Sequence, residues 1–264
     1  PIAKLTPGKD YLKPEINLII DDMIDNTHRL DFSKFLLDWL EKKINSDLKS
    51  LTDLKNISNS NSSIRALAYQ LYENNGVIKR DNVKEFLKNL SQDERKVLRN
   101  LGVKFGRYHI FLFKLFKPNA VSLRIVLWKN FHQKYFNLTP PTFGLNFLKD
   151  KKEYSREFML LCGFEKFDSF FVRIDILERL FIKIMSYINK KNKEVKLTPE
   201  MLNLLGCNKE DFLKLIKKMN YFSFMKNEET YFRYNPLKNS KKQFSTKLLK
   251  KENPFNVLKN INFK

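Results

Sequence analysis

The stretch Leu101–Trp128 constrains the fold more than any other part of the chain, because it mixes cations with bulky apolar side chains. Its five cations stand among Phe, Tyr, Leu, Ile and Trp residues; they are Lys104, Arg107, Lys114, Lys117 and Arg124. Charged side chains are rarely buried without partners, and a purely soluble surface would not carry so many Phe and Leu residues. The pattern predicts an element that packs on one side and presents cations to a polyanion on the other. The alternative is a core element whose lysines reach solvent along their stems.

The charge of the chain favours an anionic partner. Its 264 residues include 50 Lys and Arg against 29 Asp and Glu, for a net charge of +21. Residues 1–57 have a net charge of −1, residues 58–235 of +15, and residues 236–264 of +7. Nucleic acid is the first expectation and an acidic membrane surface the second. No apolar run reaches membrane-spanning length, so we expect no membrane as partner.

The sequence offers no pattern for catalysis or for a resident cofactor. The phosphate-binding pattern G-x-x-x-x-G-K-[ST] is absent, as are nucleophile–base and two-metal patterns. The three histidines and two cysteines have no metal-ligand spacing. We therefore expect no catalytic residue, no metal and no cofactor in this chain. Cys162 and Cys207 are expected to be buried thiols in a reducing compartment, which predicts a cytoplasmic location.

The first part of the chain is predicted to be a helical subdomain of residues 1–140. Residues 1–30 are expected to be irregular, and apolar periodicity predicts one helix over residues 32–55. Further helices are predicted over residues 64–73, 81–90 and 118–136, with a capping box at Ser91 and Glu94. The basic and aromatic stretch has strand character over residues 104–113, although Gly106 makes it irregular. Thr139-Pro140-Pro141 is the predicted boundary.

Residues 141–235 are predicted to form a winged-helix-like module, followed by a lysine-rich tail of residues 236–264. Helices are expected over residues 172–188, 198–206 and 209–220, and strands over 194–197, 221–225 and 230–234. The fold class predicted from these elements is mainly α. In the last helix three lysines lie opposite the apolar face, where a recognition helix would contact phosphate; they are Lys214, Lys217 and Lys218. The alternative is a solvated lysine face on an ordinary amphipathic helix.

Tyr108, next to Arg107 and His109, could stack with unpaired bases, although such rings more often belong to a core. The candidate nucleic-acid-binding residues are therefore Lys104, Arg107, Tyr108, Lys114, Lys117 and Arg124, followed by the three lysines of residues 214–218. Because the chain starts at Pro1 rather than Met, we also expect it to be processed or part of a longer protein.

Several stretches resemble the C-terminal region of an alphaproteobacterial ATP-dependent helicase family that is similar to the mitochondrial degradosome RNA helicase. The matching stretches cover nearly the whole chain; they are Leu5–Ile16, Ser63–Ile78, Leu90–Trp128, Val172–Leu180, Leu204–Tyr221 and Asn253–Lys259. The most specific part is LGVKFGRYHIFLFKLFKP, together with the LLGC turn downstream. The two motor lobes that bind ATP in such helicases are absent from this sequence.

The resemblance implies an accessory role beside a motor. ATP and Mg²⁺ would bind to upstream helicase lobes in the same polypeptide, and this chain would grip RNA, in preference to DNA, by phosphate contacts and stacking. A ribonuclease is a further partner that the resemblance suggests. Two alternatives remain open at this stage: a winged-helix regulator that reads a duplex DNA site, and a scaffold that recruits a protein.

Overall fold

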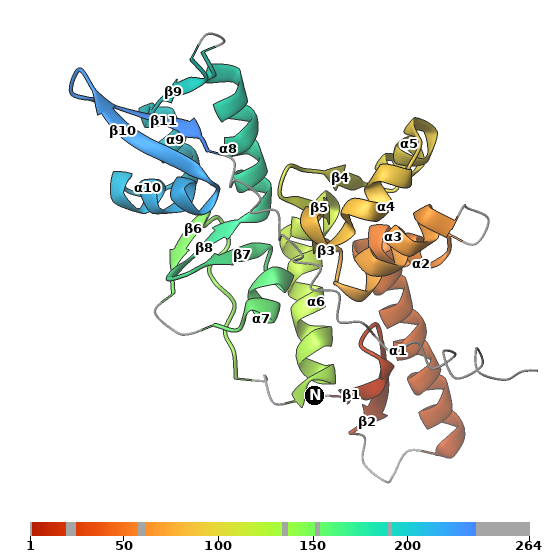
Figure 1. Cartoon of the computed structure of the whole chain (residues 1–264). Helices are drawn as coiled ribbons and strands as arrows, with labels where there is room; N and C mark the ends of the chain where they lie inside the picture. Colours follow the sequence, from red (N-terminus) through yellow and green to blue (C-terminus); the bar gives the residue numbers. More distant parts are fainter. Residues whose placement is uncertain are drawn as a thin grey trace, which may run out of the picture.

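The protein is of mixed α/β class. The computed structural model describes residues 2–19, 25–57, 62–133, 137–150, 154–189 and 192–235. Of these residues 53% are helical and 23% lie in strands, which form four small antiparallel sheets. The molecule is elongated, with the N-terminal elements at one end and the C-terminal sheet at the other (Figure 1).

The chain opens with a β-hairpin and a long helix. Strands β1 (Ala3–Asp10) and β2 (Lys13–Leu18) pair antiparallel, with a register shift between Thr6 and Asp10. Helix α1 (Asn26–Asp47) packs beside β2, and α2 (Lys49–Lys55) follows it directly. Leu40 and Ile44 of α1 are buried, whereas Phe35 and Trp39 are exposed. The helix therefore packs on the hairpin and on α6 along only part of its surface.

The rest of the described chain repeats one arrangement three times: a helix, a strand, a helical segment and a β-hairpin whose second strand lies in the middle of the sheet. The first unit contains α3 (Ser62–Glu73), β3 (Val77–Lys79), η1 (Arg80–Val83), α4 (Lys84–Asn89), α5 (Gln92–Asn100), β4 (Val103–Phe105) and β5 (His109–Leu112). Its sheet has the order β3-β5-β4. The short 3₁₀ helix η2 (Phe113–Phe116) leads out of this unit.

The second unit contains α6 (Pro118–Phe131), β6 (Phe147–Lys149), α7 (Arg156–Leu161), β7 (Phe164–Phe167) and β8 (Phe170–Arg173). The third contains α8 (Ile174–Tyr187), β9 (Glu194–Lys196), α9 (Pro199–Leu205), α10 (Lys209–Lys218), β10 (Tyr221–Lys226) and β11 (Glu229–Tyr234). Their sheets have the orders β6-β8-β7 and β9-β11-β10. In all three units the first strand pairs with the last, which is the same topology.

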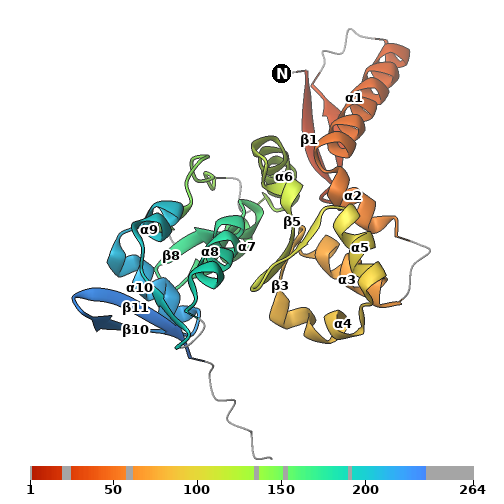
Figure 2. The same ribbon diagram turned by 90° about the horizontal axis from the view of Figure 1, so that it is seen from above.

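Helix α6 and strand β8 join the units. Ala120 and Leu127 of α6 belong to the first core, while Ile125 and Trp128 belong to a second core with α7. In β8, Phe171 enters that second core, whereas Phe170 and Val172 enter the core of the third unit. Figure 2 shows α6 between the β1–β2 hairpin and α7. The three units therefore share hydrophobic cores and do not form separately packed domains.

The predicted fold class, mainly α with a winged-helix-like module, was wrong. Sheets occur along the whole described chain, and residues 141–235 hold the second sheet, which the sequence reading did not assign. The expected irregular start is the β1–β2 hairpin, and the expected helix over residues 32–55 starts at Asn26 and breaks at Leu48. The predicted strand over residues 104–113 is in fact two strands, β4 and β5, joined at Gly106.

Several individual elements were predicted well. The helix over residues 64–73 is α3, and Ser91 and Glu94 form the expected capping box at α5. The helices and strands expected between residues 172 and 234 are α8 to α10 and β9 to β11. The helix predicted to reach Phe136 is α6, which ends at Phe131, and the whole 236–264 tail lies outside the described residues.

Candidate nucleic-acid interface

A basic cleft lies between the β4–β5 turn of the first unit and helix α8 of the third. Its volume is about 730 Å³. Five cations and four rings are among its lining residues: Arg80, Lys104, Arg107, Arg173 and Arg179, with Phe105, Phe111, Phe113 and Phe181. Among the residues that the structure describes, Asp175 and Glu178 are the acids that line it. The turn and α8 lie side by side at the centre of the molecule (Figure 1).

Glu178 fills the inside of the β4–β5 turn. Its carboxylate accepts hydrogen bonds from three successive backbone N–H groups, at 2.5 Å from Arg107 and 2.8 Å from Tyr108 and His109. A Cβ on Gly106 would lie 2.3 Å from the Glu178 Cδ, so any other residue there would displace the carboxylate. The Arg80 guanidinium completes the turn by donating to the Gly106 carbonyl at 2.8 Å. An anion supplied by α8 therefore shapes the loop that carries Arg107.

Within the described residues, one of the five cations that line the cleft, Arg173, is paired with an acid. Asp175 is held by Arg173 through two hydrogen bonds of 2.7 Å, and Glu178 is occupied by the backbone of the turn. Lys104, Arg107 and Arg179 are exposed and form no salt bridge within the described ranges. The Arg107 guanidinium lies 5.9 Å from the centre of the Phe181 ring. The cleft therefore offers positive charge beside aromatic surface, which suits phosphates and bases.

A buried acid–base cluster supports the turn from behind. The His109 Nε2 atom lies 2.9 Å from Oε2 of Glu165, and its Nδ1 lies 3.8 Å from Oε1 of Glu178. Arg156 donates two hydrogen bonds to Glu165, and the Lys79 ammonium lies 3.4 Å from the same carboxylate. The cluster ties β5 of the first unit to β7 and α7 of the second and to α8 of the third.

The pKa shifts of Glu165 and His109 are set by their pairing with opposite charges more than by burial. Burial by itself would raise the pKa of Glu165, but hydrogen bonds from His109 and Arg156 outweigh it and lower the pKa to about 2. Burial would likewise lower the pKa of His109, but Glu165 and the neighbouring Glu178 outweigh it and raise the pKa. Both results favour a charged pair, imidazolium against carboxylate.

The five cations predicted in residues 101–128 lie in three different environments. Lys104 and Arg107 line the cleft, whereas the exposed Lys114 and Lys117 lie in and just after η2 and do not line it. Arg124 is fully buried, so its assignment as a nucleic-acid contact was wrong. The Arg124 guanidinium donates to the carbonyls of Asn75, Leu115 and Leu161, and helix α6 carries it into the core because Val121, Ile125 and Trp128 share its side.

Tyr108 and the lysines of α10 also have partners. The Tyr108 ring packs edge-on against Phe181 at 5.8 Å, and Tyr108 is half-buried against the core cluster that contains Tyr221. Lys214 and Lys218 lie 3.7 Å and 2.7 Å from the carboxylates of Asp211 and Asp168. Lys214, Lys217 and Lys218 are exposed on α10 and do not line the cleft. The structure thus brings together only Lys104 and Arg107 of the predicted set.

Sequence reasoning missed Arg80, Arg179 and the rings Phe113 and Phe181. Arg179 had a readable signal, because it stands on α8 opposite the buried Ile176, Leu180 and Ile184. Arg80 had none, because η1 follows a three-residue strand and nothing local indicates which way its side chain points.

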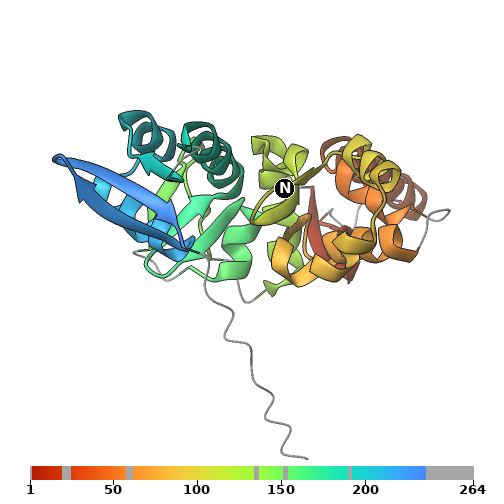
Figure 3. The same cartoon turned by 45° about the horizontal axis from the view of Figure 1, so that its top comes forward.

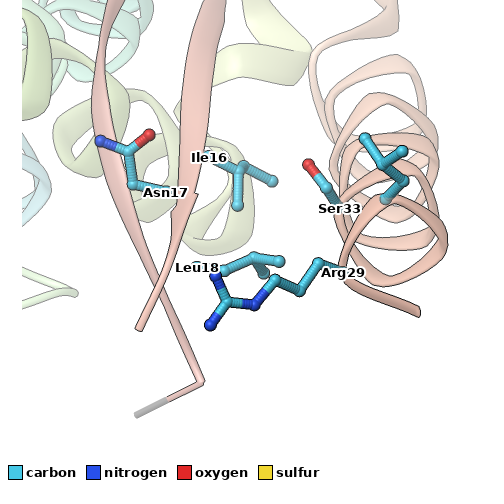
Figure 4. A pocket seen from close by; sticks show the side chains of 6 residues that line it. Ile16, Asn17, Leu18, Arg29 and Ser33 are labelled. Atoms are coloured by element: carbon cyan, nitrogen blue, oxygen red, sulfur yellow. The ribbon is translucent and has the colours of Figure 1, made fainter. Parts of the chain in front are cut away.

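A second hollow, of about 630 Å³, lies between β2 and the start of α1. Figure 4 shows Arg29 reaching toward Leu18 across this hollow, with Asn17 and Ser33 on either side. Its lining residues include one cation and no aromatic ring. It is therefore less suited to a polyanion than the cleft at α8.

Other kinds of site find little support within the described residues. They contain no group of three or more His, Cys, Asp or Glu residues that could hold a metal ion. No helix there is long and apolar enough to cross a membrane. Cys162 is buried and Cys207 half-buried, and both thiols are free. Burial raises the pKa of Cys162 to about 12 and of Cys207 to about 11, so neither thiol is activated.

Comparison of the chain with protein-family models, with curated protein sequences and with solved structures finds no match.

Proposed function

We propose that this chain binds single-stranded nucleic acid, RNA in preference to DNA, in the cleft between the β4–β5 turn and α8. The observation that carries the proposal is the set of three exposed cations without acid partners, Lys104, Arg107 and Arg179, on one cleft with half-exposed rings. Cations would hold phosphates, and Phe113, 47% exposed, offers a ring to a base. The proposal fits the net charge of +15 over residues 58–235.

We also propose that the chain is the accessory region of an ATP-dependent helicase in the cytoplasm. The support for this step is the sequence resemblance, strongest over Leu101–Pro118, the stretch that contains the β4–β5 turn. Upstream motor lobes would bind ATP and Mg²⁺ and move the strand. The cleft would hold the strand as it enters or leaves the motor, so the chain by itself would bind RNA without hydrolysing ATP.

The test is a salt titration of RNA binding by the full chain. A variant with Lys104→Gln, Arg107→Gln and Arg179→Gln loses three cations of the cleft. If each contacts one phosphate of a single strand, the slope of log K against log salt falls by about 2, since each contact contributes about 0.7. Fluorescence anisotropy with a labelled single-stranded RNA at four or more salt concentrations measures this slope.

The matched control removes the same charge from α10 through Lys214→Gln, Lys217→Gln and Lys218→Gln. Lys214 and Lys218 already face acids, so we expect the control to lose much less slope than the cleft variant. Equal losses in the two variants would mean that net charge alone attracts RNA, and the cleft proposal would fail. Weak RNA binding together with a protein partner retained in high salt would favour the scaffold alternative.

A further inference from the structure

The outer face of the C-terminal sheet carries a row of aromatic rings. Residues opposite one another in β10 and β11 share a face, which places Phe222 beside Arg233 and Phe224 beside Tyr231. The rings of Phe222 and Phe224 are 6.3 Å apart and inclined by 17°, and those of Phe224 and Tyr231 are 6.1 Å apart and inclined by 21°. Three rings therefore form a nearly parallel row.

This row is not part of a core. The other face of the same hairpin supplies the buried side chains Tyr221, Thr230 and Phe232, which pack toward the helices of the third unit. Phe222 is 60% exposed, and Phe224 and Tyr231 are half-buried. In Figure 3 the hairpin, drawn in blue, forms one end of the molecule, with helices on one side of it. Exposed contiguous rings of this kind indicate a binding surface.

The charges around the row favour an anion. Lys196 is paired with Glu229, and the Lys226 ammonium lies 3.7 Å from Glu194, so these four charges cancel. Arg233 is exposed at the end of the row; Glu194 of β9 lies opposite it, but Arg233 forms no salt bridge in the part of the chain that the structure describes. The sequence that follows β11, residues 236–264, has eight lysines and one glutamate. An aromatic row with an exposed arginine at its end matches a polyanion with flat rings, which is a single-stranded nucleic acid.

One end of the row lies near the cleft. Tyr221, on the inner face of the hairpin, belongs to the core cluster against which Tyr108, the residue after Arg107, packs, and the Tyr221 ring lies 5.3 Å from that of Tyr234. Phe222 and Arg233 are the next residues along β10 and β11. A strand that leaves the cleft past Arg107 would therefore meet the Arg233 end of the row first.

We infer that the outer face of the β9–β11 sheet binds unpaired bases by stacking on Phe222, Phe224 and Tyr231, and extends the cleft. The inference rests on the proposed function, because it places the bases of the strand whose phosphates the cleft would hold. Stacking needs bases that are free of a duplex, so this surface selects single strands over duplexes.

The test compares three variants of the full chain with wild type. The first, Phe222→Leu with Phe224→Leu and Tyr231→Leu, keeps apolar side chains on the outer face of the sheet but removes the rings. The second, Phe222→Tyr with Phe224→Tyr, keeps the rings and is the matched control. The third is the cleft variant described above. Each is titrated with a single-stranded RNA of about 15 nucleotides, a span of the order bound by stacking proteins, and with its blunt duplex, after thermal unfolding has checked the fold.

We expect the ring-less variant to lose about tenfold or more in single-strand affinity, since each stacked base contributes strongly to binding. Its salt slope and duplex binding should stay as in wild type, and the tyrosine variant should bind like wild type. If the ring-less variant binds normally while the cleft variant loses affinity and slope, the stacking inference is overturned and the proposed function stands. If wild type binds neither RNA, both are overturned.

The ring-less variant could also unfold, which thermal unfolding would reveal. Phe222→Leu alone then replaces it, because this ring is the most exposed of the three and contributes least to packing. A several-fold loss of single-strand affinity supports the inference, and unchanged affinity overturns it.

Discussion

Arg124 carries its charge inside the molecule. Its guanidinium is fully buried and donates to the carbonyls of Asn75, just after α3, Leu115 in η2 and Leu161 at the end of α7. Helix C-termini carry partial negative charge, so a cation where such ends meet is stabilised. Burial lowers the pKa of Arg124 to about 10, which leaves it charged at neutral pH. This arginine therefore holds three segments together.

We expect Arg124→Met to lower the free energy of unfolding by about 3 kcal/mol or more, because it leaves three carbonyls without a donor. Arg107→Met, at an exposed position, should change it by no more than about 0.5 kcal/mol. Urea unfolding followed by circular dichroism measures both. Similar values for the two variants would contradict the structural role of Arg124.

The His109–Glu165 pair makes a prediction about pH. The lowered pKa of Glu165 contributes stability that is present above its ordinary pKa of 4.5 and is lost as the pH falls toward about 2. The raised pKa of His109 contributes stability that is present below 6.5 and is lost as the pH rises through its folded value. Glu178, Arg156 and Lys79 also face the pair.

Between pH 5 and 8.5 the melting temperature of wild type should therefore fall more than that of His109→Gln, which cannot titrate. Differential scanning calorimetry at half-unit steps gives the two curves. Parallel curves would contradict the prediction, because they would show that folding does not raise the pKa of His109.

At the scale of elements, the conformation of the β4–β5 turn depends on a side chain from another element, Glu178 of α8. Gly106 leaves the space that the Glu178 carboxylate fills, so Gly106→Ala must displace this carboxylate and weaken its hydrogen bonds to the turn. We expect a loss of about 2 kcal/mol or more in the free energy of unfolding and weaker RNA binding, because Arg107 is displaced.

A second substitution separates this clash from an effect of alanine on the turn. Adding Glu178→Ala to Gly106→Ala removes the clash, so the double variant should cost less than the sum of the two single changes. Chemical unfolding of all four proteins completes the cycle, and strictly additive losses would contradict the contact.

The same scale explains what the sequence could and could not predict. Helices with a visible apolar face or a cap, such as α5 with Ser91 and Glu94, were readable. Strands of three residues, such as Val77–Lys79, are too short to show alternation. His109–Leu112 is buried at every position, so it lacks alternation as well. The cleft depends on contacts between residues about 70 apart, as in Glu178 with Arg107, which no local pattern reveals.

At the scale of the whole molecule, shared elements couple the three units. Helix α6 packs into two cores, and β8 alternates between two, with Phe171 on one side and Phe170 and Val172 on the other. A fourth cluster, Val77 with Phe111 and Ile174, joins the first unit to the start of α8. No unit can lose its packing without exposing apolar surface of a neighbour.

This coupling predicts one cooperative unfolding transition despite the length of the chain. Leu127→Ala acts on the first core and Phe171→Ala on the second, and each should cost about 2–5 kcal/mol. Both should move the whole urea transition, whether it is followed by circular dichroism or by fluorescence, to which the buried Trp128 contributes. The fluorescence of the exposed Trp39 adds a small sloping baseline.

If Leu127→Ala moved the circular dichroism curve but left the fluorescence curve unchanged, the first unit would unfold by itself. The cleft would then open at a lower urea concentration than the rest, because its two walls belong to the first and third units.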